Sequence, residues 1–349
     1  MMLDSPKILS LATSYPPYIL DQRRVVETAQ EIFSGDFSDF RRLAPIFENA
    51  GIETRHSCVP LEWYLEPHDF AERNRIYLEN AVALLRRAST DCLHAAGLAA
   101  ADIDMIVTVS SSGIATPSLD ALLLEELPFR RDVGRLPIFG LGCAGGIVGM
   151  SRAAALCRAQ PGDRILFLVV ELCGLTFRHG DRSKSNVVAT ALFGDGAAGA
   201  ILSCEGEGPT ITAWGEHCFP NSLGVMGWDV RNDGLAVVFS RHIPAIVRDE
   251  MGPVARGFIG KQGLGPTDVS RFLCHPGGAK VLDALETVFG LPEGGLADSR
   301  SVLREHGNMS AATVMFVLER ALSQGARGHL LLSSLGPGFT AAFALIDAP

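Results

Sequence analysis

Two stretches of the chain, LAAADIDMIVTVSSSG (98–113) and LGPTDVSRFLCHPGG (264–278), follow the same plan half a chain apart. Asp102 in the first stretch corresponds to Asp268 in the second. Each copy begins with a leucine and an aspartate, which are typical of the end of a helix and of a cap. An apolar run follows and is interrupted by small residues. The pattern predicts, in both places, a buried strand that ends at a tight turn.

Two further pairs of segments extend the repeat to whole halves of the chain. GDRILFLVVELCG (162–174) matches GARGHLLLSSLGPG (325–338) in kind, and both halves close with a Phe-led, alanine-rich strand, FGDGAAGAILS (193–203) and FTAAFALIDA (339–348). Strands that alternate with helices predict parallel βαβ units in an α/β fold. The alternative is a chance similarity between two ordinary βα units. The helices between the strands are predicted at 147–158, 279–288 and 311–323.

The composition is that of an ordinary globular protein. The chain has 349 residues, of which 47% are hydrophobic and 20% are charged, so it has room for one large or two medium domains with a buried core. Its formal net charge of −9 argues against a nucleic-acid partner, because phosphate binding requires a basic face. A local basic funnel on an acidic protein still permits an anionic substrate.

The eight cysteines and the N-terminal stretch bear on the cellular setting. No cysteines occur in CxxC pairs or at zinc-ligand spacing, so we expect neither a metal site nor a disulfide framework. The start of the sequence has no basic region before a long apolar stretch, and no apolar run approaches membrane-spanning length. We therefore expect a cytoplasmic protein without stable membrane insertion.

The stretch FGLGCAGGIVGM (139–150) places Cys143 between glycines, where an apolar run ends and an alanine-rich helix begins. One interpretation is a packed core residue, because cysteine is among the most buried residue types. The other is a nucleophile on a tight strand-to-helix turn. There, glycines allow close approach of backbone and substrate, and the helix N-terminus favours the thiolate.

His275 in RFLCHPGGAK and Asn308 in EHGNMSAATVMF stand at two further junctions before helices. Taken alone, such a histidine is most simply a hydrogen-bonded residue, and such an asparagine is an N-cap. Two similar α/β halves would, however, bring equivalent strand ends together at the centre, where open α/β sheets bind ligands. We therefore interpret Cys143, His275 and Asn308 as one site.

The three residue types suit chemistry on thioesters. A thiol with a pKa of about 8.5 requires a partner to ionise at neutral pH, and an imidazole provides it as an ion pair. The amide of Asn308 and an N–H of His275 can donate hydrogen bonds to a thioester carbonyl, and one such donor typically contributes ~2.7–4 kcal/mol in the transition state. Neither residue needs to remove a proton from carbon. The set therefore predicts thioester acylation followed by decarboxylative carbon–carbon bond formation.

Five motifs resemble those of the type III polyketide synthases, the chalcone synthase-like branch of the thiolase superfamily, in the same order and over essentially the whole chain. The resemblance implies an α/β fold of the thiolase-like five-layered αβαβα type. It implies two duplicated halves, 1–205 with the cysteine and 206–349 with the histidine and asparagine. It also implies a homodimer that uses acyl-CoA and malonyl-CoA as substrates, with no carrier protein and no cofactor. The motifs are GCAGG (142–146), ALFGDGAA (191–198), HPGGAK (275–280), GNMSAA (307–312) and GPGFT (336–340).

The same resemblance implies individual roles. Cys143 would hold the starter and the growing chain as a thioester, while His275 and Asn308 would bind the carbonyls and promote decarboxylation. Phe193 matches the gatekeeper aromatic between the CoA tunnel and the cavity; the alternative is a core phenylalanine. Other positions that would line the cavity are Cys173, Ser310, Gly336, Pro337 and Gly338.

Three positions depart from the plant enzymes. Val237 stands where they have a second gatekeeper phenylalanine, Trp228 where they have a glycine in the cavity floor, and Thr116 where a methionine reaches into the partner's cavity. The side chains at positions 237 and 116 would enlarge the cavity relative to the plant enzymes, whereas Trp228 would fill part of it. Phenylpropanoid starters are therefore not expected.

The CoA-binding positions also depart from the plant pattern. Of the basic residues that contact CoA phosphates in plant enzymes, only Arg41 has a counterpart here, and the others fall on Ala44 and Glu48.

Stretches such as SSGIATPSLDALL (111–123) and GVMGWDVRNDG (224–234) are similar to bacterial members of the family. Our preferred hypothesis is a long-chain fatty acyl-CoA starter, extended with malonyl-CoA and cyclised to an alkylpyrone or an alkylresorcinol. Three alternatives stay open: a malonyl-primed synthase of a small aromatic or pyrone, an initiating ketoacyl-ACP synthase, and a non-catalytic acyl-binding protein. Ketoacyl synthases usually carry His-Gln-Ala-Asn, whereas Pro-Gly-Gly follows His275 here.

Overall fold

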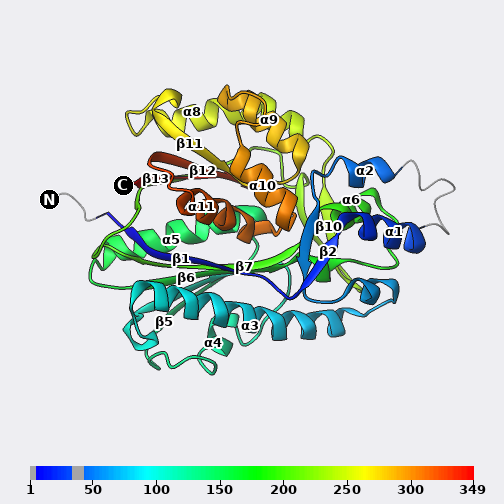
Figure 1. The fold of residues 1–349 in the computed structure, drawn as a ribbon, viewed down its shortest axis with the longest axis horizontal. Helices are drawn as coiled ribbons and strands as arrows, with labels where there is room; N and C mark the ends of the chain where they lie inside the picture. Colours follow the sequence, from blue (N-terminus) through cyan, green and yellow to red (C-terminus); the bar gives the residue numbers. More distant parts are fainter. Residues whose placement is uncertain (1–4, 34–42) are drawn as a thin grey trace.

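Two half-sheets meet at the centre of the molecule (Figure 1). The computed structural model describes residues 5–33 and 43–349. Within them, nine strands form one sheet in the order β11-β12-β13-β8-β1-β7-β6-β4-β5, and Lys7 of β1 pairs with Thr210 of β8 where the halves join. The strands are β1 (Lys7–Ser14), β4 (Met105–Val109), β5 (Gly134–Ile138), β6 (Ile165–Leu172), β7 (Asp195–Ser203), β8 (Thr210–Cys218), β11 (Val269–Cys274), β12 (Gly328–Gly336) and β13 (Thr340–Ala348).

The strand plan confirms the repeat. From the junction outward, β1-β7-β6-β4 and β8-β13-β12-β11 both have two antiparallel pairings followed by a parallel one. The aspartates also correspond: Asp102 accepts a hydrogen bond from the Ala99 N–H at 2.8 Å, and Asp268 accepts one from the Gly265 N–H at 2.7 Å. The similarity seen in the sequence is therefore structural.

Helices and half-sheets alternate in five layers, the thiolase-like arrangement that the resemblance implied (Figure 1). One helical layer packs on the outer face of the N-terminal half-sheet, a second lies between the half-sheets, and a third packs on the outer face of the C-terminal half-sheet. The layers contain, in this order, α3 (Phe70–Ala96) and α4 (Leu119–Leu123); α5 (Gly145–Ala159) and α11 (Thr313–Ser323); and α8 (Gly252–Gly260), α9 (Ala279–Phe289) and α10 (Ala297–His306).

The alternation of side chains along β6 explains the layering. Leu166 and Leu168 contribute to the core under α3, whereas Phe167 and Val169 contribute to the central core with α5 and α11. Successive side chains of a strand point to opposite faces. A strand that is buried at every position is therefore covered by helices on both faces.

The three predicted helices are confirmed, with small differences at their ends. The helix predicted at 147–158 is α5, which begins at Gly145, and the helix predicted at 279–288 is α9. The helix predicted at 311–323 is α11; it begins at Thr313 because a 3₁₀ turn, Ser310–Ala312, precedes it.

Smaller elements surround the end of the molecule at which the catalytic candidates lie. Two of them form the hairpin β9–β10, which is separate from the large sheet. Within the part of the chain that the structure describes, no helix is both long and apolar enough to cross a membrane. The elements are β2 (Tyr18–Asp21), α1 (Gln22–Phe33), α2 (Ala44–Glu48), β3 (Thr54–Ser57), α6 (Lys184–Leu192), β9 (Met226–Arg231), β10 (Gly234–Phe239), α7 (Ile243–Ile246) and a π-helix, Val247–Met251.

The two central helices come so close that one position excludes a side chain. A β-carbon at Gly146 of α5 would lie 2.2 Å from the carbonyl oxygen of Ala311 and 2.8 Å from Cγ1 of Val314. Because backbone atoms cannot move aside as a flexible side chain does, the glycine sets the distance between the halves.

Gly146→Ala is expected to lower the free energy of unfolding by ~1–3 kcal/mol, the usual cost of overpacking. The measurement is urea denaturation followed by circular dichroism. Gly257→Ala in α8 is the control, since nothing lies within 4 Å of a β-carbon there, and alanine in a helix interior should stabilise by roughly 0.5–1 kcal/mol. Equal stability of Gly146→Ala and wild type would contradict the limit on helix spacing.

Candidate active site

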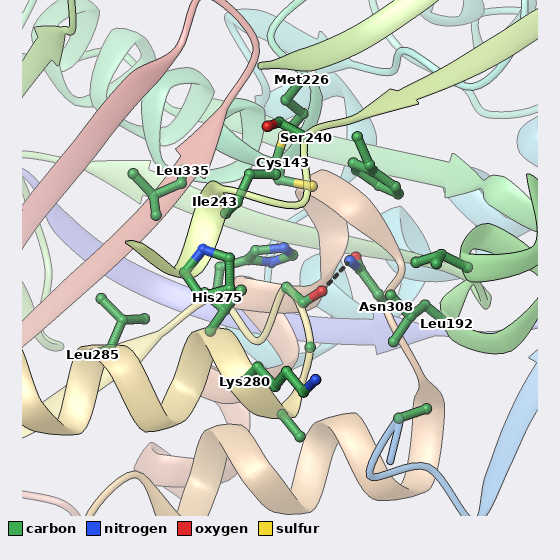
Figure 2. Close-up of a pocket in the computed structure, with 18 of the residues that line it drawn as sticks. Cys143, Leu192, Met226, Ser240, Ile243, His275, Lys280, Leu285, Asn308 and Leu335 are labelled. Atoms are coloured by element: carbon green, nitrogen blue, oxygen red, sulfur yellow. Dashed lines mark hydrogen bonds between the residues drawn. The ribbon is translucent and has the colours of Figure 1, made fainter. Parts of the chain in front are cut away.

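Cys143, His275 and Asn308 line one cavity of about 430 Å³ (Figure 2). Cys143 lies on a 3₁₀ turn, Gly142–Ala144, directly before α5. His275 follows the last residue of β11, and Asn308 follows α10. The structure therefore brings together three side chains that are far apart in the sequence, from both halves of the chain.

The glycines around Cys143 let its turn lie against the end of β12. Gly142 has φ of +46°, and a β-carbon there would lie 2.6 Å from Cδ of Pro337. A β-carbon at Gly336 would lie 2.5 Å from the carbonyl oxygen of Leu141 and 2.7 Å from the amide nitrogen of Ala144. The GPGFT loop thus lies against the turn of Cys143, and both segments need glycine there. Leu335, directly before the loop, lines the cavity, whereas Gly336, Pro337 and Gly338 are not among its lining residues.

The thiol of Cys143 is buried and neutral in the ligand-free protein. Burial raises its pKa to about 12, and a hydrogen bond to Ser310 partly opposes that shift. The sulfur lies 3.6 Å from Oγ of Ser310. Ser310 itself has φ of +47°, a left-handed conformation that is costly for a non-glycine residue and occurs most often at functional sites.

His275 is also neutral, and its ring has free hydrogen-bonding capacity. Only 4% of the residue is exposed, and neither ring nitrogen has a partner among the residues that the structure describes. Burial lowers the pKa of His275 to about 3. The thiolate–imidazolium pair expected from the sequence is therefore not the ligand-free state, because burial disfavours both charges. Unpaired buried polar atoms are rare and costly, so they point to a ligand that pairs with them.

The amide of Asn308 has one role within the fold and one that faces the cavity. Its oxygen accepts a hydrogen bond from the Ser310 N–H at 2.8 Å. Asn308 is not an N-cap, however, because the cap of the 3₁₀ turn is Met309 and the cap of α11 is Ala312. Its nitrogen donates to the carbonyl of Gly277 over a long 3.4 Å (Figure 2). The first contact fixes the orientation of the amide, and the weak second contact leaves its N–H groups available.

Phe193 is joined directly to Asn308 through the backbone. The two residues form an isolated parallel β-bridge. The Asn308 N–H donates to the carbonyl of Leu192 at 2.8 Å, and the Gly194 N–H donates to the carbonyl of Asn308 at 3.1 Å. The gatekeeper candidate and the amide therefore share one rigid piece of backbone.

An aromatic cluster surrounds Phe193. Its ring lies 6.2 Å from the ring of Trp228 and 5.8 Å from that of Phe239, both edge-on, and it packs with Cys173 and Val237. Sequence analysis missed Phe239, which also lines the cavity. Positions 237 and 239 share one face of β10 because side chains alternate along a strand. Phe239 therefore provides the aromatic ring that Val237 lacks. The spacing of two residues along one strand was the signal by which the sequence could have indicated Phe239.

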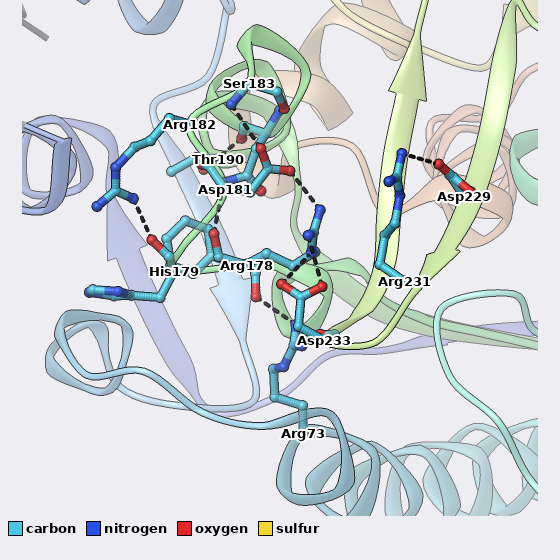
Figure 3. Close-up of polar contacts among 12 residues, drawn as sticks. Arg73, Arg178, His179, Asp181, Arg182, Ser183, Thr190, Asp229, Arg231 and Asp233 are labelled. Carbon is cyan, nitrogen blue, oxygen red and sulfur yellow. Dashed lines mark hydrogen bonds and ion pairs between the residues drawn. The ribbon is translucent and has the colours of Figure 1, made fainter. Parts of the chain in front are cut away.

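The hairpin β9–β10 presents Trp228 and Val237 as cross-strand partners. Trp228 Nε1 donates to the carbonyl of Ser111 at 2.8 Å. At the turn of the hairpin, Arg178 makes two hydrogen bonds to Asp233, at 2.8 and 2.9 Å, and buried Arg73 donates to the backbone carbonyl of Asp233 (Figure 3). The wall that carries Trp228 and Val237 is therefore fixed at both ends.

The remaining predicted positions lie elsewhere. Thr116 is exposed on the surface of the single chain, before a cis peptide bond to Pro117. Arg41 lies outside the described residues.

Two cations that sequence analysis missed, Lys280 and Arg241, line the cavity. The signal for Lys280 was its place as the last residue of the HPGGAK motif. No group of three or more potential metal ligands occurs within residues 5–33 and 43–349.

The five-layered fold, with a cysteine, a histidine and an asparagine around one apolar cavity, defines the class of thiolase-like acyltransferases. The family model described as the chalcone and stilbene synthases, N-terminal domain, matches residues 4–206, and the model of the C-terminal domain matches residues 211–346. The chain therefore belongs to the chalcone and stilbene synthase family, the type III polyketide synthases.

Relatives of the same length support this assignment. A putative chalcone synthase of Bacillus subtilis is 39% identical, over 97% of this chain and 98% of the relative. A 1,3,6,8-tetrahydroxynaphthalene synthase of Streptomyces peucetius is 38% identical, over 97% of this chain and 92% of the relative. The crystal structure of the 1,3,6,8-tetrahydroxynaphthalene synthase of Streptomyces coelicolor superposes with a TM-score of 0.91 at 29% identity, covering 98% of this chain and 99% of that one. The protein is an enzyme that forms carbon–carbon bonds by acyl transfer.

The buried imidazole of His275 should make the fold sensitive to acid. Its pKa is about 3 in the folded protein, against about 6.5 in an unfolded chain. The unfolded chain therefore binds more protons below pH 6.5. The free energy of unfolding should fall with pH in that range, by up to about 1.4 kcal/mol per pH unit.

The measurement is urea denaturation at pH 7 and pH 5.5. His275→Gln should lose part of the difference between the two pH values, since partly buried His306, whose pKa burial lowers to about 4, contributes over the same range, whereas replacing the exposed His94 in the same way should leave it unchanged. An acid sensitivity as large in His275→Gln as in wild type would show that His275 is not the group responsible.

Proposed function

We propose that Cys143 is the nucleophile of a type III polyketide synthase and that His275 and Asn308 are its hydrogen-bond donors and proton carrier. The starter in this proposal is a long-chain fatty acyl-CoA, extended with malonyl-CoA and cyclised to an alkylpyrone or alkylresorcinol. The observation that carries the proposal is the pair of unpartnered ring nitrogens of His275 in the same cavity as Cys143 and Asn308.

The first step is acyl transfer. The sulfur of Cys143 attacks the thioester carbonyl while His275 accepts the thiol proton, so no isolated charge forms in the buried pocket. The bond from carbon to the sulfur of CoA then breaks, and the proton on His275 passes to the departing CoA thiolate. Cys143 is left as an acyl thioester and His275 is neutral again.

The second step is decarboxylation and condensation. The carbon–carbon bond to the carboxylate of malonyl-CoA breaks, CO₂ leaves, and the electron pair forms an enolate. The N–H groups of His275 and Asn308 donate to the enolate oxygen, where negative charge develops. The enolate carbon attacks the acyl thioester, and the sulfur of Cys143 leaves as a thiolate. A neutral imidazole suits this step because it donates a hydrogen bond without needing a proton from solution.

The two steps should separate by mutation. Cys143→Ala should form no acyl-enzyme but keep the decarboxylation of malonyl-CoA, because breaking that bond does not need the sulfur. Asn308→Ala should lower decarboxylation by about 10²–10³-fold, the usual effect of losing one such donor. The assays are mass spectrometry of the acyl-enzyme and release of labelled CO₂.

Asn80→Ala is the control for the second variant, since that amide donates to the carbonyl of Ile76 within α3, far from the cavity lining. A thermal melt shows whether Asn308→Ala is folded. Full decarboxylation by a folded Asn308→Ala would remove Asn308 from the proposed mechanism.

The mostly apolar main cavity of about 430 Å³ supports an aliphatic starter. A second, much smaller cavity of about 50 Å³ is lined by Cys173 and Phe193, and on its other side by apolar residues that include Val25 and Ala29 of α1. Cys173 lies close enough to Cys143 for a charge on one thiol to raise the pKa of the other. A tail that displaces Phe193 would enter this space.

A second candidate function is favoured by the relatives. Several of them are named 1,3,6,8-tetrahydroxynaphthalene synthases. By that analogy, the enzyme would be primed by malonyl-CoA itself and make a small aromatic product. In that case Trp228, which fills part of the cavity wall beside Phe193, would suit a short starter.

Labelled malonyl-CoA offered with a series of acyl-CoA starters separates the two candidates. We expect incorporation of long-chain starters. In Ala29→Leu, which fills the second cavity, kcat/KM for these starters should fall about tenfold, while consumption of malonyl-CoA alone is unchanged. Gln30→Leu, on the exposed side of α1, is the control. Products that are the same whichever acyl-CoA is added would reject the long-chain starter and favour malonyl priming.

We also propose a homodimer that places Thr116 at the subunit interface. Exposed Ile114 and Phe139, at 47% and 61% exposure, follow the neighbouring strands β4 and β5 and so leave the same edge of the sheet. Exposed apolar side chains grouped at one place are typical of an interface.

A further inference from the structure

A buried arginine holds the end of α6, directly before the gatekeeper candidate Phe193. Arg55 of β3 is 3% exposed. Its Nη1 donates to the carbonyls of Thr190 and Phe193 at 2.8 and 3.0 Å, and its Nη2 donates to the carbonyl of Ala191 at 3.0 Å. The last carbonyls of a helix have no partner within it, and a cation suits the negative end of the helix dipole. Arg55 therefore caps α6 where the chain enters the bridge to Asn308.

The stem of the same side chain lies next to both segments of the bridge. A β-carbon at Gly194 would lie 3.4 Å from Cβ of Arg55, and a β-carbon at Gly307 would lie at the same distance from it. Gly194 follows Phe193, and Gly307 precedes Asn308. One side chain is therefore adjacent to the backbone of the gatekeeper candidate and to that of the amide.

Gln22, the first residue of α1, links this cap to α2. Its Oε1 accepts from Nη2 of Arg55, and its Nε2 donates to the carbonyls of Ala191 and Phe47 at 3.2 and 3.3 Å. Among the described residues, the hydrogen bonds of Arg55 all go to uncharged oxygens. Because the guanidinium is planar and its donors have a fixed geometry, these bonds set the positions of the carbonyls relative to one another.

The charge of this group indicates a role beyond packing. Burial lowers the pKa of Arg55 to about 10, so the guanidinium is still charged at neutral pH. Its Nε has no partner within the part of the chain that the structure describes. A stable core alone is built more easily from apolar side chains of similar volume, since a buried charge is unfavourable. Arg55 and Phe193 also line the second cavity together.

We propose that Arg55 is a positioning residue of the reaction, which holds the end of α6 so that Phe193 and Asn308 keep the places that catalysis requires. Arg55 is not among the residues that line the main cavity, so it acts through these two residues. Leu192, the last residue of α6, lies beside Asn308 and accepts a hydrogen bond from its N–H (Figure 2). The inference rests on the proposed function, because it assumes that the amide of Asn308 donates to the reacting carbonyl.

The test is a double-mutant cycle on the decarboxylation of malonyl-CoA. Arg55→Lys keeps the charge but lacks the planar group that reaches three carbonyls. Its kcat should fall about 10- to 100-fold, with KM changed by less than about threefold, because the displaced amide acts in the transition state. In Asn308→Ala, which has already lost the amide, Arg55→Lys should lower kcat by less than about twofold. Arg158→Lys is the control, since Arg158 also donates to a backbone carbonyl, that of Thr212 at 3.0 Å, and is not a cavity-lining residue.

A second variant decides the matter if Arg55→Lys does not fold. Gln22→Met removes one acceptor of Arg55 and one donor to Ala191 with little change in volume. Its kcat should fall about three- to tenfold, as for the loss of one hydrogen bond, and this loss should also disappear in Asn308→Ala. A thermal melt followed by circular dichroism gives the folded fraction to which each kcat is referred.

Two results would overturn the positioning role. One is an unchanged kcat in the folded Arg55→Lys and Gln22→Met variants. The other is a loss that remains undiminished in the Asn308→Ala background, since Arg55 would then act by another route. If Asn308→Ala alone leaves decarboxylation unchanged, the proposed function fails as well. A normal loss in Asn308→Ala without any loss in the other two variants rejects only the role of Arg55.

Discussion

The close backbone contact between the two halves is the constraint on which the rest of the structure depends. Gly142 and Gly336 leave no room for side chains where the turn of Cys143 lies against the end of β12, and Gly146 does the same where α5 meets Ala311. At this distance the cysteine of one half shares a cavity with the histidine and asparagine of the other. A side chain at any of these glycines would separate the nucleophile from its partners before it affected either half alone.

The sequence was sufficient for the plan of the fold and for the three central residues, because both follow from local patterns. The repeated Leu–Asp–strand segments predict matching βα units, and strand ends in such units meet. The charge states were not predictable in this way: burial raises the pKa of Cys143 and lowers that of His275, and burial depends on the whole fold. Phe239 could not be predicted because its role depends on which face of β10 points inward, and Lys280 because only the folded chain shows that the start of α9 lines the cavity.

The cavity has two different electrostatic environments. Its inner end is uncharged, and the end near the start of α9 carries basic side chains. At the inner end, burial raises the pKa of the Cys143 thiol and lowers the pKa of the His275 imidazole, so both are neutral. In the proposed mechanism the proton passes between them, which avoids an unpaired buried charge. Near the start of α9, the exposed side chains of Lys280 and Arg241 line the cavity, and no described aspartate or glutamate lines it, in a chain whose formal net charge is −9. An anionic substrate is attracted to this place on a protein that otherwise repels it.

The bridge between Phe193 and Asn308 links substrate selection to reaction rate. Phe193 borders the apolar space behind the site, Asn308 carries the amide that we propose donates to the reacting carbonyl, and the same two backbone hydrogen bonds hold both. A larger or smaller group at the gate therefore also displaces the amide that activates the substrate. Efforts to broaden the range of starters by redesign at this position will meet a loss of turnover. Changes on the hairpin β9–β10, which reaches the same space from an independent support, avoid that penalty.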